Sequence, residues 1–418
     1  MVLIQKRVNY SYINIIILIS IFFVYLSIPE SAFSNSMKTT AWIHAETKKP
    51  FLNTAIQSHR NDNTSGLRFK KKFNSVKFKF AISANNKNKL AFDQSFIEFE
   101  SKNKTFGVGK IDRNWSFSPN TSLILSNNAR PANSIYFVYN NDQRLNNFLT
   151  SWAGPISLEV FNSTPSTTIK VKNSMLFGMR AVIEPVQNLK LELLKVSQWG
   201  GDGQSENLSS FLASIIGNTN EDQHSNINQL AGYGISYLTN LIETPVRFYA
   251  QLIGEDEAGS LPSCLMSLIG SELQFPTNKL ISHLGIEFID TRISTSTHGY
   301  CGTNTAYNNG VYSYTNYGNT MGTGIDTEGT SLEFFGRSQV SEKIHIEYST
   351  KAVVINDVNW SDHRISSKRQ SGFISSIGTS WNKNNLNLNG NIFYQDFNLN
   401  KANIMSGLGI SISSSIMF

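Results

Sequence analysis

Short segments in which apolar and polar residues alternate repeat along most of this 418-residue chain. In the stretch "SVKFKFAIS", Val76, Phe78 and Phe80 lie on one face of a strand, and Lys77 and Lys79 lie on the other. The stretches "HLGIEFID" and "KIHIEYS" alternate in the same way. A period of two residues is that of a β-strand whose two faces meet different surroundings. The pattern therefore predicts an all-β protein.

Two architectures could use such strands. A soluble sandwich or propeller buries the apolar face in a core, whereas an outer-membrane barrel turns it toward lipid. We count about eighteen candidate strands, an even number typical of single-chain bacterial barrels. The last segment places Ile410, Ile412, Ile416 and Phe418 in one register, as expected for a closing strand that ends at the periplasmic interface. The sequence favours a transmembrane antiparallel β-barrel of about 18 strands.

The lengths of the connections favour the barrel over the sandwich, because outer-membrane barrels have short periplasmic turns and long outer loops. Counting back from a periplasmic C-terminus, the expected periplasmic connections are short and lie near residues 382–384, 338–341, 276–280, 240–244 and 186–188. The expected outer connections are longer and lie near residues 355–368, 292–329, 254–263 and 198–229.

The N-terminus has the pattern of a secretory signal. A basic start precedes an apolar stretch from Ile13 to Ile28, and Ala32 and Ser34 supply the small residues of a cleavage site. A retained membrane anchor is the alternative, although the apolar stretch is short for a spanning helix. We expect a signal peptide over residues 1–34, a short periplasmic segment over 35–65, and the barrel over 66–418.

The stretch "SLILSNNARP" interrupts the strand pattern. Three apolar residues, Leu123–Leu125, stand directly beside Asn127, Asn128 and Arg130. A further strand would explain them less well than a re-entrant loop inside the lumen, with its apolar residues packed and its polar residues facing a polar interior. We take Asn127, Asn128, Arg130 and the nearby Trp115 as candidate plug residues.

One expected outer loop contains a helical pattern. In "SENLSSFLASIIGN", the apolar residues follow the spacing of an amphipathic helix: Leu208, Phe211, Leu212, Ile215 and Ile216. Because an apolar face needs a partner, we expect this helix to cap the barrel mouth from outside. A strand remains the alternative.

Several motifs, taken together, resemble those of one family. In chain order they are "RNWSFSPNTSLILSNNARP", "FGMRAVIEPVQNLKLELLKVSQWGGDG", "NQLAGYG", "RFYAQLIGEDEAGSLPS" and "DTRIS…TNTAYNNGVYS…MGTGIDTEG". Over most of its length, from about residue 65 to 418, the chain resembles the capsule assembly protein Wzi family.

This resemblance implies an outer-membrane barrel whose outer loops close the mouth, with a helical bundle at the periplasmic end. It also implies a non-enzymatic, lectin-like anchor for capsular polysaccharide. Two features depart from the family. Few residues precede the expected first strand, so the bundle is expected to be reduced or missing, and the lead into the re-entrant stretch carries Trp115 as its single tryptophan.

Candidate polysaccharide contacts lie in the long loop from Arg292 to Gly329 and in the preceding acidic loop. Tyrosine offers a flat apolar body with a polar tip, which suits sugar rings and hydroxyls. The candidates are Tyr300, Tyr307, Tyr312, Tyr314, Tyr317, Asp256 and Glu257. The alternative for each tyrosine is a place in an interfacial aromatic belt.

The acidic run at Glu255, Asp256 and Glu257 allows three interpretations. It could supply a glycosidase carboxylate, with a second one from Asp326 or Glu328. It could bind calcium, although adjacent acids do not give the alternating ligand spacing. It could also shape a tight loop through hydrogen bonds to backbone or arginines, which is the interpretation that we favour.

The chain has two cysteines, Cys264 and Cys301, which the strand parity places on the same, outer side of the membrane. Thiols within reach of each other tend to pair in an oxidising compartment. The sequence gives no distance between them, so a disulfide and two unpaired thiols remain open.

The formal charge of +6 is mild, and no basic run is interleaved with aromatic residues, so nucleic-acid binding is not expected. The seven histidines lack metal-ligand spacing, and the common catalytic and phosphate-binding motifs are absent from the sequence. We expect no cofactor, no metal and no catalytic activity. The expected partners are capsular or extracellular polysaccharide, outer-membrane lipid and, for insertion, the barrel assembly machinery.

These observations favour a monomeric outer-membrane protein of a Gram-negative bacterium that attaches or organises surface polysaccharide by lectin-like binding through its outer loops. A porin or diffusion channel is the alternative, because a barrel of this size can hold an open pore. A surface enzyme that processes glycans is the third possibility.

Overall fold

The computed structural model describes residues 37–51, 63–85, 89–144, 150–166, 170–216, 226–258, 261–277, 280–293 and 301–418. The strands of the first half are β1 (Met37–Glu46), β2 (Thr64–Phe73), β3 (Val76–Asn85), β4 (Leu90–Ala91), β5 (Phe96–Ser101), β6 (Lys104–Lys110), β7 (Asn133–Asn141), β8 (Ile156–Thr164), β9 (Met175–Val186) and β10 (Leu189–Trp199). Those of the second half are β11 (Asn228–Leu241), β12 (Thr244–Ala258), β13 (Leu261–Thr277), β14 (Leu280–Asp290), β15 (Thr315–Asn316), β16 (Asn319–Thr320), β17 (Thr330–Gln339), β18 (Ile344–Ile355), β19 (Gln370–Lys383), β20 (Leu386–Gln395) and β21 (Gly407–Met417). The helices are η2 (Ser151–Ala153), α2 (Leu208–Ile216) and η3 (Asn400–Ala402).

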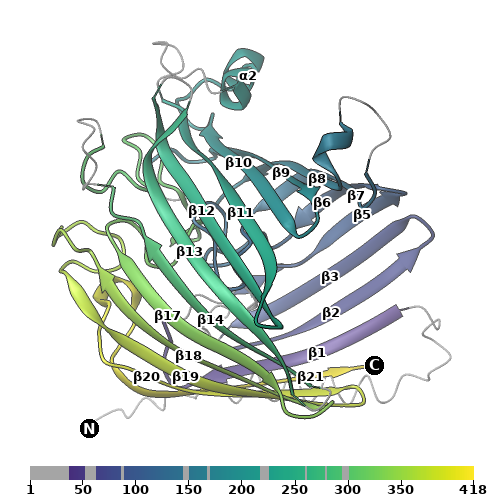
Figure 1. The fold of residues 1–418 in the computed structure, drawn as a ribbon. Coiled ribbons are helices and arrows are strands. Elements are labelled where there is room, and N and C mark those ends of the chain that lie inside the picture. The colour runs from purple at the N-terminus through teal and green to yellow at the C-terminus, as the bar shows by residue number, and fades with distance from the viewer. Residues whose placement is uncertain are drawn as a thin grey trace, which may run out of the picture.

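The sheet closes on itself as a barrel (Figure 1). Within the described residues, 19 strands form one sheet, and β15 and β16 form a separate hairpin. Apart from β4, each strand of this sheet pairs antiparallel with the next strand of the sheet, β14 with β17 included, and β1 pairs with β21 to complete the ring. The short β4 and the longer β5 both pair with β3 and together cross the barrel wall once. The 19 strands therefore make 18 passes across the membrane. This confirms the predicted barrel of about eighteen strands.

The barrel begins earlier in the chain than we predicted. Strand β1, Met37–Glu46, lies inside the range 35–65 that we expected to be a periplasmic segment, so the expected barrel start at residue 66 is wrong. This strand alternates like the others, with Ile43 exposed and Trp42 and His44 buried. It is needed because β2 and β21 would otherwise each present an unpaired edge. The expected signal peptide, residues 1–34, lies outside the described residues.

The strands alternate between lipid and lumen as the sequence predicted. On β13, the outward Leu265 and Ile269 are 43% and 56% exposed, whereas the inward Met266 and Leu268 are fully buried. Turning the apolar residues outward suits a hydrocarbon solvent. The buried inward residues show that part of the lumen is filled.

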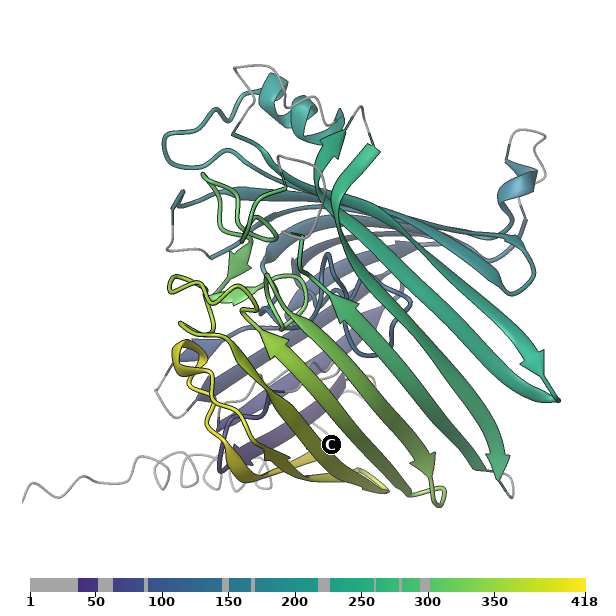
Figure 2. The same ribbon diagram turned by 60° about the vertical axis from the view of Figure 1, so that its left-hand side comes forward.

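The two ends of the barrel differ as the loop lengths predicted (Figure 2). The connections near 382–384, 338–341, 276–280, 240–244 and 186–188 are short and share the end that holds the C-terminus. The exception at that end is the connection 142–155, which carries η2. At the other end, the expected long loop at 254–263 is a hairpin tip, because β12 and β13 extend to Ala258 and Leu261. By the rule for such barrels, the short turns face the periplasm.

The helices in the described part of the chain are all too short or too polar to cross a membrane.

We expect Ile269→Arg to lower the free energy of unfolding by about 2–4 kcal/mol, because it places a cation at the middle of the lipid face. Urea unfolding of the protein in lipid vesicles measures this change. Leu241→Arg is the matched control, since Leu241 is 50% exposed but lies at the β11–β12 turn. A charge near the interface should cost about 0–1 kcal/mol. Equal losses at the two positions would contradict this membrane placement.

Candidate functional site

The segment between β6 and β7, residues 111–132, folds back into the barrel and is here called the plug (Figure 2). Leu123 and Ile124 are fully buried and Leu125 nearly so. Trp115 is also buried, and its ring lies 5.3 Å from that of Phe161 on the wall strand β8. The apolar residues of "SLILSNNARP" are therefore packed inside the lumen as a re-entrant loop, as the sequence favoured.

Polar side chains of the barrel wall hold the plug on two sides. The Gln251 amide on β12 accepts a hydrogen bond from the Leu123 N–H at 2.8 Å and donates to the Trp115 carbonyl at 2.7 Å. Glu159 on β8 accepts from the Trp115 indole at 3.0 Å and from Arg113 Nε at 2.7 Å. Buried polar groups that are satisfied in this way fix one arrangement of the segment.

Three plug residues, Phe117, Ser118 and Asn120, form hydrogen bonds with further side chains of the barrel wall. Ser118 Oγ donates to Glu287 on β14, and Arg247 on β12 donates to the Phe117 carbonyl at 2.7 Å. Arg337 on β17 donates to Asn120 Oδ1 at 3.3 Å. The plug is thus attached to β8, β12, β14 and β17, on different sides of the lumen.

The polar residues of the plug partly follow our expectation. Asn127 is half-buried, and Asn128 donates to the Thr320 carbonyl at 2.8 Å. Arg130 forms two hydrogen bonds with Asp93, at 2.7 and 3.0 Å. Asn128 contacts the outer loop, and Arg130 pairs with a residue just before β5, so these side chains join the plug to its surroundings.

The outer loop 301–329 lies on the plug, and its tyrosines form the contact. Tyr307 donates its hydroxyl to the Leu123 carbonyl at 2.6 Å, and Tyr314 donates to the Ile124 carbonyl at 2.7 Å. Their rings stack with centroids 5.8 Å apart. These carbonyls could not reach water, so the hydroxyls satisfy groups that would otherwise be buried without a partner.

Three of the candidate sugar contacts are therefore wrong. Tyr307, Tyr312 and Tyr314 are buried, and each hydroxyl is bonded to a backbone carbonyl, that of Gly200 in the case of Tyr312. Burial also raises the pKa of Tyr312 to about 12. Tyr300 and the side chains of Asp256 and Glu257 lie outside what the structure describes.

Tyr317 is the candidate that remains at the surface, with 43% of its area exposed. The Arg130 guanidinium lies over its ring at 4.1 Å, and Lys110 Nζ is 3.2 Å from its hydroxyl. Elsewhere in the same loop, the Asn308 side chain and the Asn309 carbonyl accept hydrogen bonds from Lys170. We call Tyr317, Lys110 and Arg130 the mouth patch; it combines an exposed aromatic side chain with two cations.

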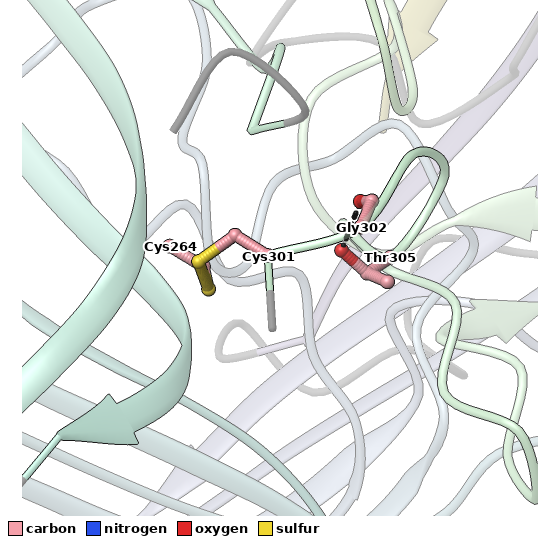
Figure 3. The surroundings of a disulfide bond; sticks show 4 residues. All are labelled: Cys264, Cys301, Gly302 and Thr305. Carbon is pink, nitrogen blue, oxygen red and sulfur yellow. Dashed lines mark hydrogen bonds between the residues drawn. A yellow bond between two sulfur atoms is a disulfide. The ribbon is translucent and has the colours of Figure 1, made fainter. Parts of the chain in front are cut away.

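A disulfide joins Cys264 on β13 to Cys301 at the start of the loop (Figure 3). The Cα atoms are 5.4 Å apart, and both residues are buried. Just beyond it, the Thr305 hydroxyl donates to the Gly302 carbonyl at 2.8 Å. The bridge that the sequence left open is therefore formed, and it fixes the loop to the barrel wall where the loop enters the mouth.

The acidic residues that could have formed a catalytic pair have structural partners. Glu255 accepts from the Tyr307 N–H at 3.0 Å, and Glu328 accepts from the Asn304 N–H at 2.9 Å. Asp326 is buried, and its two carboxylate oxygens accept hydrogen bonds from Nε and Nη2 of Arg364. For Glu255, this agrees with the loop-shaping interpretation of the acidic run.

The Asp326–Arg364 pair holds the outer loops together. Arg364, from the loop between β18 and β19, also donates to the Tyr307 carbonyl at 3.0 Å. Burial alone would raise the pKa of Asp326, but the charge and hydrogen bonds of Arg364 hold that pKa below its ordinary value. Burial likewise works to lower the pKa of Arg364, and Asp326 outweighs it and raises that pKa.

Helix α2 packs in a different way from our expectation. It lies at the long-loop end beside β10, with Phe211 half-buried, 5.2 Å from the Trp199 ring. Its buried residues are small: Ser210, Ala213 and Ser214. The expected apolar contacts of Leu208, Leu212 and Ile216 are wrong, since these side chains are 70%, 46% and 76% exposed, and Ile215 is half-buried. The small face lets the helix approach closely enough for Ser197 to donate to the Ser214 carbonyl at 2.7 Å.

We expect Arg364→Met to weaken the docking of loop 301–329 by about 3–5 kcal/mol, because it leaves a buried carboxylate without its partner. Faster proteolytic cleavage within this loop measures the change. Arg369→Met is the matched control, since its pair with Asp357 is largely exposed and should be worth less than about 1 kcal/mol. Equal protease sensitivity of the two variants would contradict the assignment.

The Asp326–Arg364 pair also predicts that the docking of loop 301–329 weakens at low pH. The pKa of Asp326 is lowered from 3.8, so its stabilising contribution is fully present above that value and is lost as the pH falls through the lowered pKa. Pepsin should therefore cleave the parent loop only below about pH 4. Asp326→Asn should remove this pH dependence, and a loop that opens at the same pH with or without Asp326 would contradict the prediction.

Comparison with known proteins places these features in a family. The family model "Capsule assembly protein Wzi" matches residues 32–398. An uncharacterized 55.8 kDa protein in the cps region of Klebsiella pneumoniae is 30% identical over 197 residues, which are 46% of this chain and 39% of that protein. The aligned part therefore spans about two fifths of that relative.

The fold is similar to that of solved outer-membrane proteins. The Wzi protein of Escherichia coli, an outer-membrane protein involved in group 1 capsule assembly and a carbohydrate-binding β-barrel, has a TM-score of 0.78 at 22% identity, over 91% of this chain and 84% of that one. The outer membrane protein OprD of Pseudomonas aeruginosa has a TM-score of 0.52 at 9% identity, over 92% and 93% of the two chains. A closed barrel in the outer membrane and a family match over most of its length mean that this chain belongs to the capsule assembly protein Wzi family.

Proposed function

We propose that this protein attaches or organises a capsular or extracellular polysaccharide at the cell surface, by lectin-like binding through its outer loops and without catalysis. The observation that carries the proposal is the plug, which is packed and hydrogen-bonded inside the lumen. Family membership and the carbohydrate-binding Wzi barrel of Escherichia coli support the same role.

The plug argues against the alternative of a diffusion channel. Barrels of 16–18 strands leave an aqueous channel when their lumen is empty. Here Leu123, Ile124 and Trp115 fill the lumen together with inward wall residues such as Met266 and Leu268. The outer loop covers the plug through the hydroxyls of its buried tyrosines, so a solute would have to displace both layers.

The mouth patch is the surface that we assign to polysaccharide contact. Tyr317 presents a flat ring that a sugar ring can lie against, and Lys110 and Arg130 place cations and hydrogen-bond donors beside it. Such a patch suits a polymer that carries carboxylate groups. The carboxylates of Asp326 and Glu328 are buried with partners, so they support structure better than glycoside hydrolysis.

The remaining parts of the proposal follow from the membrane location. We propose that residues 1–34 are removed as a signal peptide, that the barrel assembly machinery inserts the chain, and that it works as a monomer in contact with outer-membrane lipid. Loss of cell-attached polysaccharide in a deletion strain, with the polymer appearing in the medium, tests the cellular role.

We expect Tyr317→Ala to weaken binding of the purified surface polysaccharide by about tenfold, because a stacked ring and its neighbouring cations contribute about 1–2 kcal/mol. Binding of labelled polymer to the purified protein in detergent measures this. Trp152→Ala is the matched control, since Trp152 is an aromatic residue 62% exposed on η2, at the opposite end of the barrel. Retention of full affinity by Tyr317→Ala would contradict the contact assignment.

We also expect the parent protein to show no steady, large ion current in a planar bilayer, because the plug blocks the lumen. Replacing residues 118–128 by a short Gly-Ser linker should open a current of the size seen for porins. The folded state of the variant is checked by its heat-modifiable migration in gels. A large current through the parent would favour the channel alternative.

A further inference from the structure

A cavity of about 520 Å³ lies in the lumen on the short-turn side of the plug, and we call it the vestibule. It is lined by β1, β2, β17–β21 and one plug residue, Asn120. Its volume falls within the range of small-molecule pockets, about 300–1,000 Å³. We propose that the vestibule is a second glycan site, which binds a short oligosaccharide carrying a carboxylate. This inference goes beyond the outer-loop binding proposed above and does not depend on it.

Two lining residues hold hydrogen-bond donors that nothing in the described part of the chain satisfies. They are the Nε of Arg68 on β2 and the Nδ2 of Asn120 on the plug, both buried. A buried donor without a partner costs about 1–3 kcal/mol. A carboxylate accepts hydrogen bonds at both oxygens, and it matches the fork of a guanidinium, so it would satisfy such donors. Asp112 on the plug interacts electrostatically with Arg68, but the Nε of Arg68 still lacks a hydrogen-bond partner.

Arg337 adds a second cation on the same side of the plug. Its guanidinium donates to Asn120 Oδ1 at 3.3 Å, and its Nε lies 3.9 Å from Glu347, which is largely exposed. The amide oxygen of Asn120 is thus engaged, so its remaining hydrogen-bonding capacity is as a donor. Glu347 and Glu333 also line the vestibule, and Glu333 pairs with Lys351. The plug end of the vestibule therefore favours an acceptor-rich group through the free donors of Arg68 and Asn120.

The wall formed by β19, β20 and β21 has a different character. Its lining residues carry hydroxyls and amides, among them Ser376, Ser380, Asn389, Ser411 and Ser413. The Asn389 amide donates to the Ser413 hydroxyl at 3.2 Å. Hydroxyls and amides both donate and accept, which matches the hydroxyls of a sugar.

An aromatic ring completes the site. Trp42 on β1 lines the vestibule and lies against Gly66 on β2, where an added Cβ would stand 2.7 Å from the ring. The glycine therefore makes room for the indole beside Arg68, two residues further along the same face. Aromatic surface, sugar-matching polar groups and buried donors without a hydrogen-bond partner together fit an oligosaccharide that carries a carboxylate better than an apolar ligand.

The test measures binding of trigalacturonate to the full chain in detergent by calorimetry, with maltotriose as the neutral comparison. We expect Arg68→Met to weaken trigalacturonate binding by at least about tenfold, because it removes a charge-assisted contact. Lys104→Met is the matched control: Lys104 is an exposed cation on β6 at the same end of the barrel, outside the vestibule, and its loss should leave affinity unchanged. Heat-modifiable migration confirms that each variant is folded.

Three results would overturn the proposal: no binding of trigalacturonate by the parent, equal affinity of Arg68→Met and the parent, or loss of binding in Lys104→Met as well. Asn120→Ala provides a second variant and should also weaken binding. Tyr317→Ala separates this site from the mouth patch. If Tyr317→Ala abolishes trigalacturonate binding and Arg68→Met does not, the ligand binds at the outer loops and the vestibule assignment fails. If Arg68→Met loses trigalacturonate binding and Tyr317→Ala keeps it, the vestibule assignment is supported, whatever the outer loops bind.

Discussion

In the hydrocarbon of a bilayer, every backbone N–H and C=O group needs a partner within the protein, and the pairing of β1 with β21 meets that need for this sheet. Without this pairing, the strands would end in two unpaired edges facing lipid. Closure also sets the size of the lumen, because the width of a barrel grows with its number of strands. An eighteen-strand barrel encloses a lumen wide enough for an aqueous channel, and in this protein the plug occupies part of that lumen.

The filling of the lumen is polar at its contacts with the wall and apolar within. Glu159, Gln251 and Glu287 point inward from three strands and accept or donate hydrogen bonds to the plug, while Leu123 and Ile124 pack in its centre. The outer loop 301–329 lies on the plug in a similar way, with stacked tyrosine rings whose hydroxyls donate to carbonyls of the plug. The result is a closed stack of wall, plug and loop, which suits a binding surface better than a pore.

The stack divides the molecule into two polar surfaces with different chemistry. Outside the plug, the mouth patch presents Tyr317 among cations. On the other side, the vestibule presents Arg68 and Trp42 beside a wall of serines and asparagines, since β1 pairs directly with β21.

Sequence alone predicted most of the strands, their approximate number and the sorting of most loops, and it favoured the re-entrant plug, because alternation and composition are local and the bilayer demands them. Tertiary structure decided the rest. Tyr307 and Tyr314 have the composition of a sugar-binding loop, yet they donate to carbonyls at Leu123 and Ile124, 184 and 190 residues earlier in the chain. Whether a tyrosine faces a sugar or a distant backbone depends on how the loop meets the plug, and that contact leaves no periodic signal in the sequence. The same reason explains β1, whose partner β21 lies at the other end of the chain.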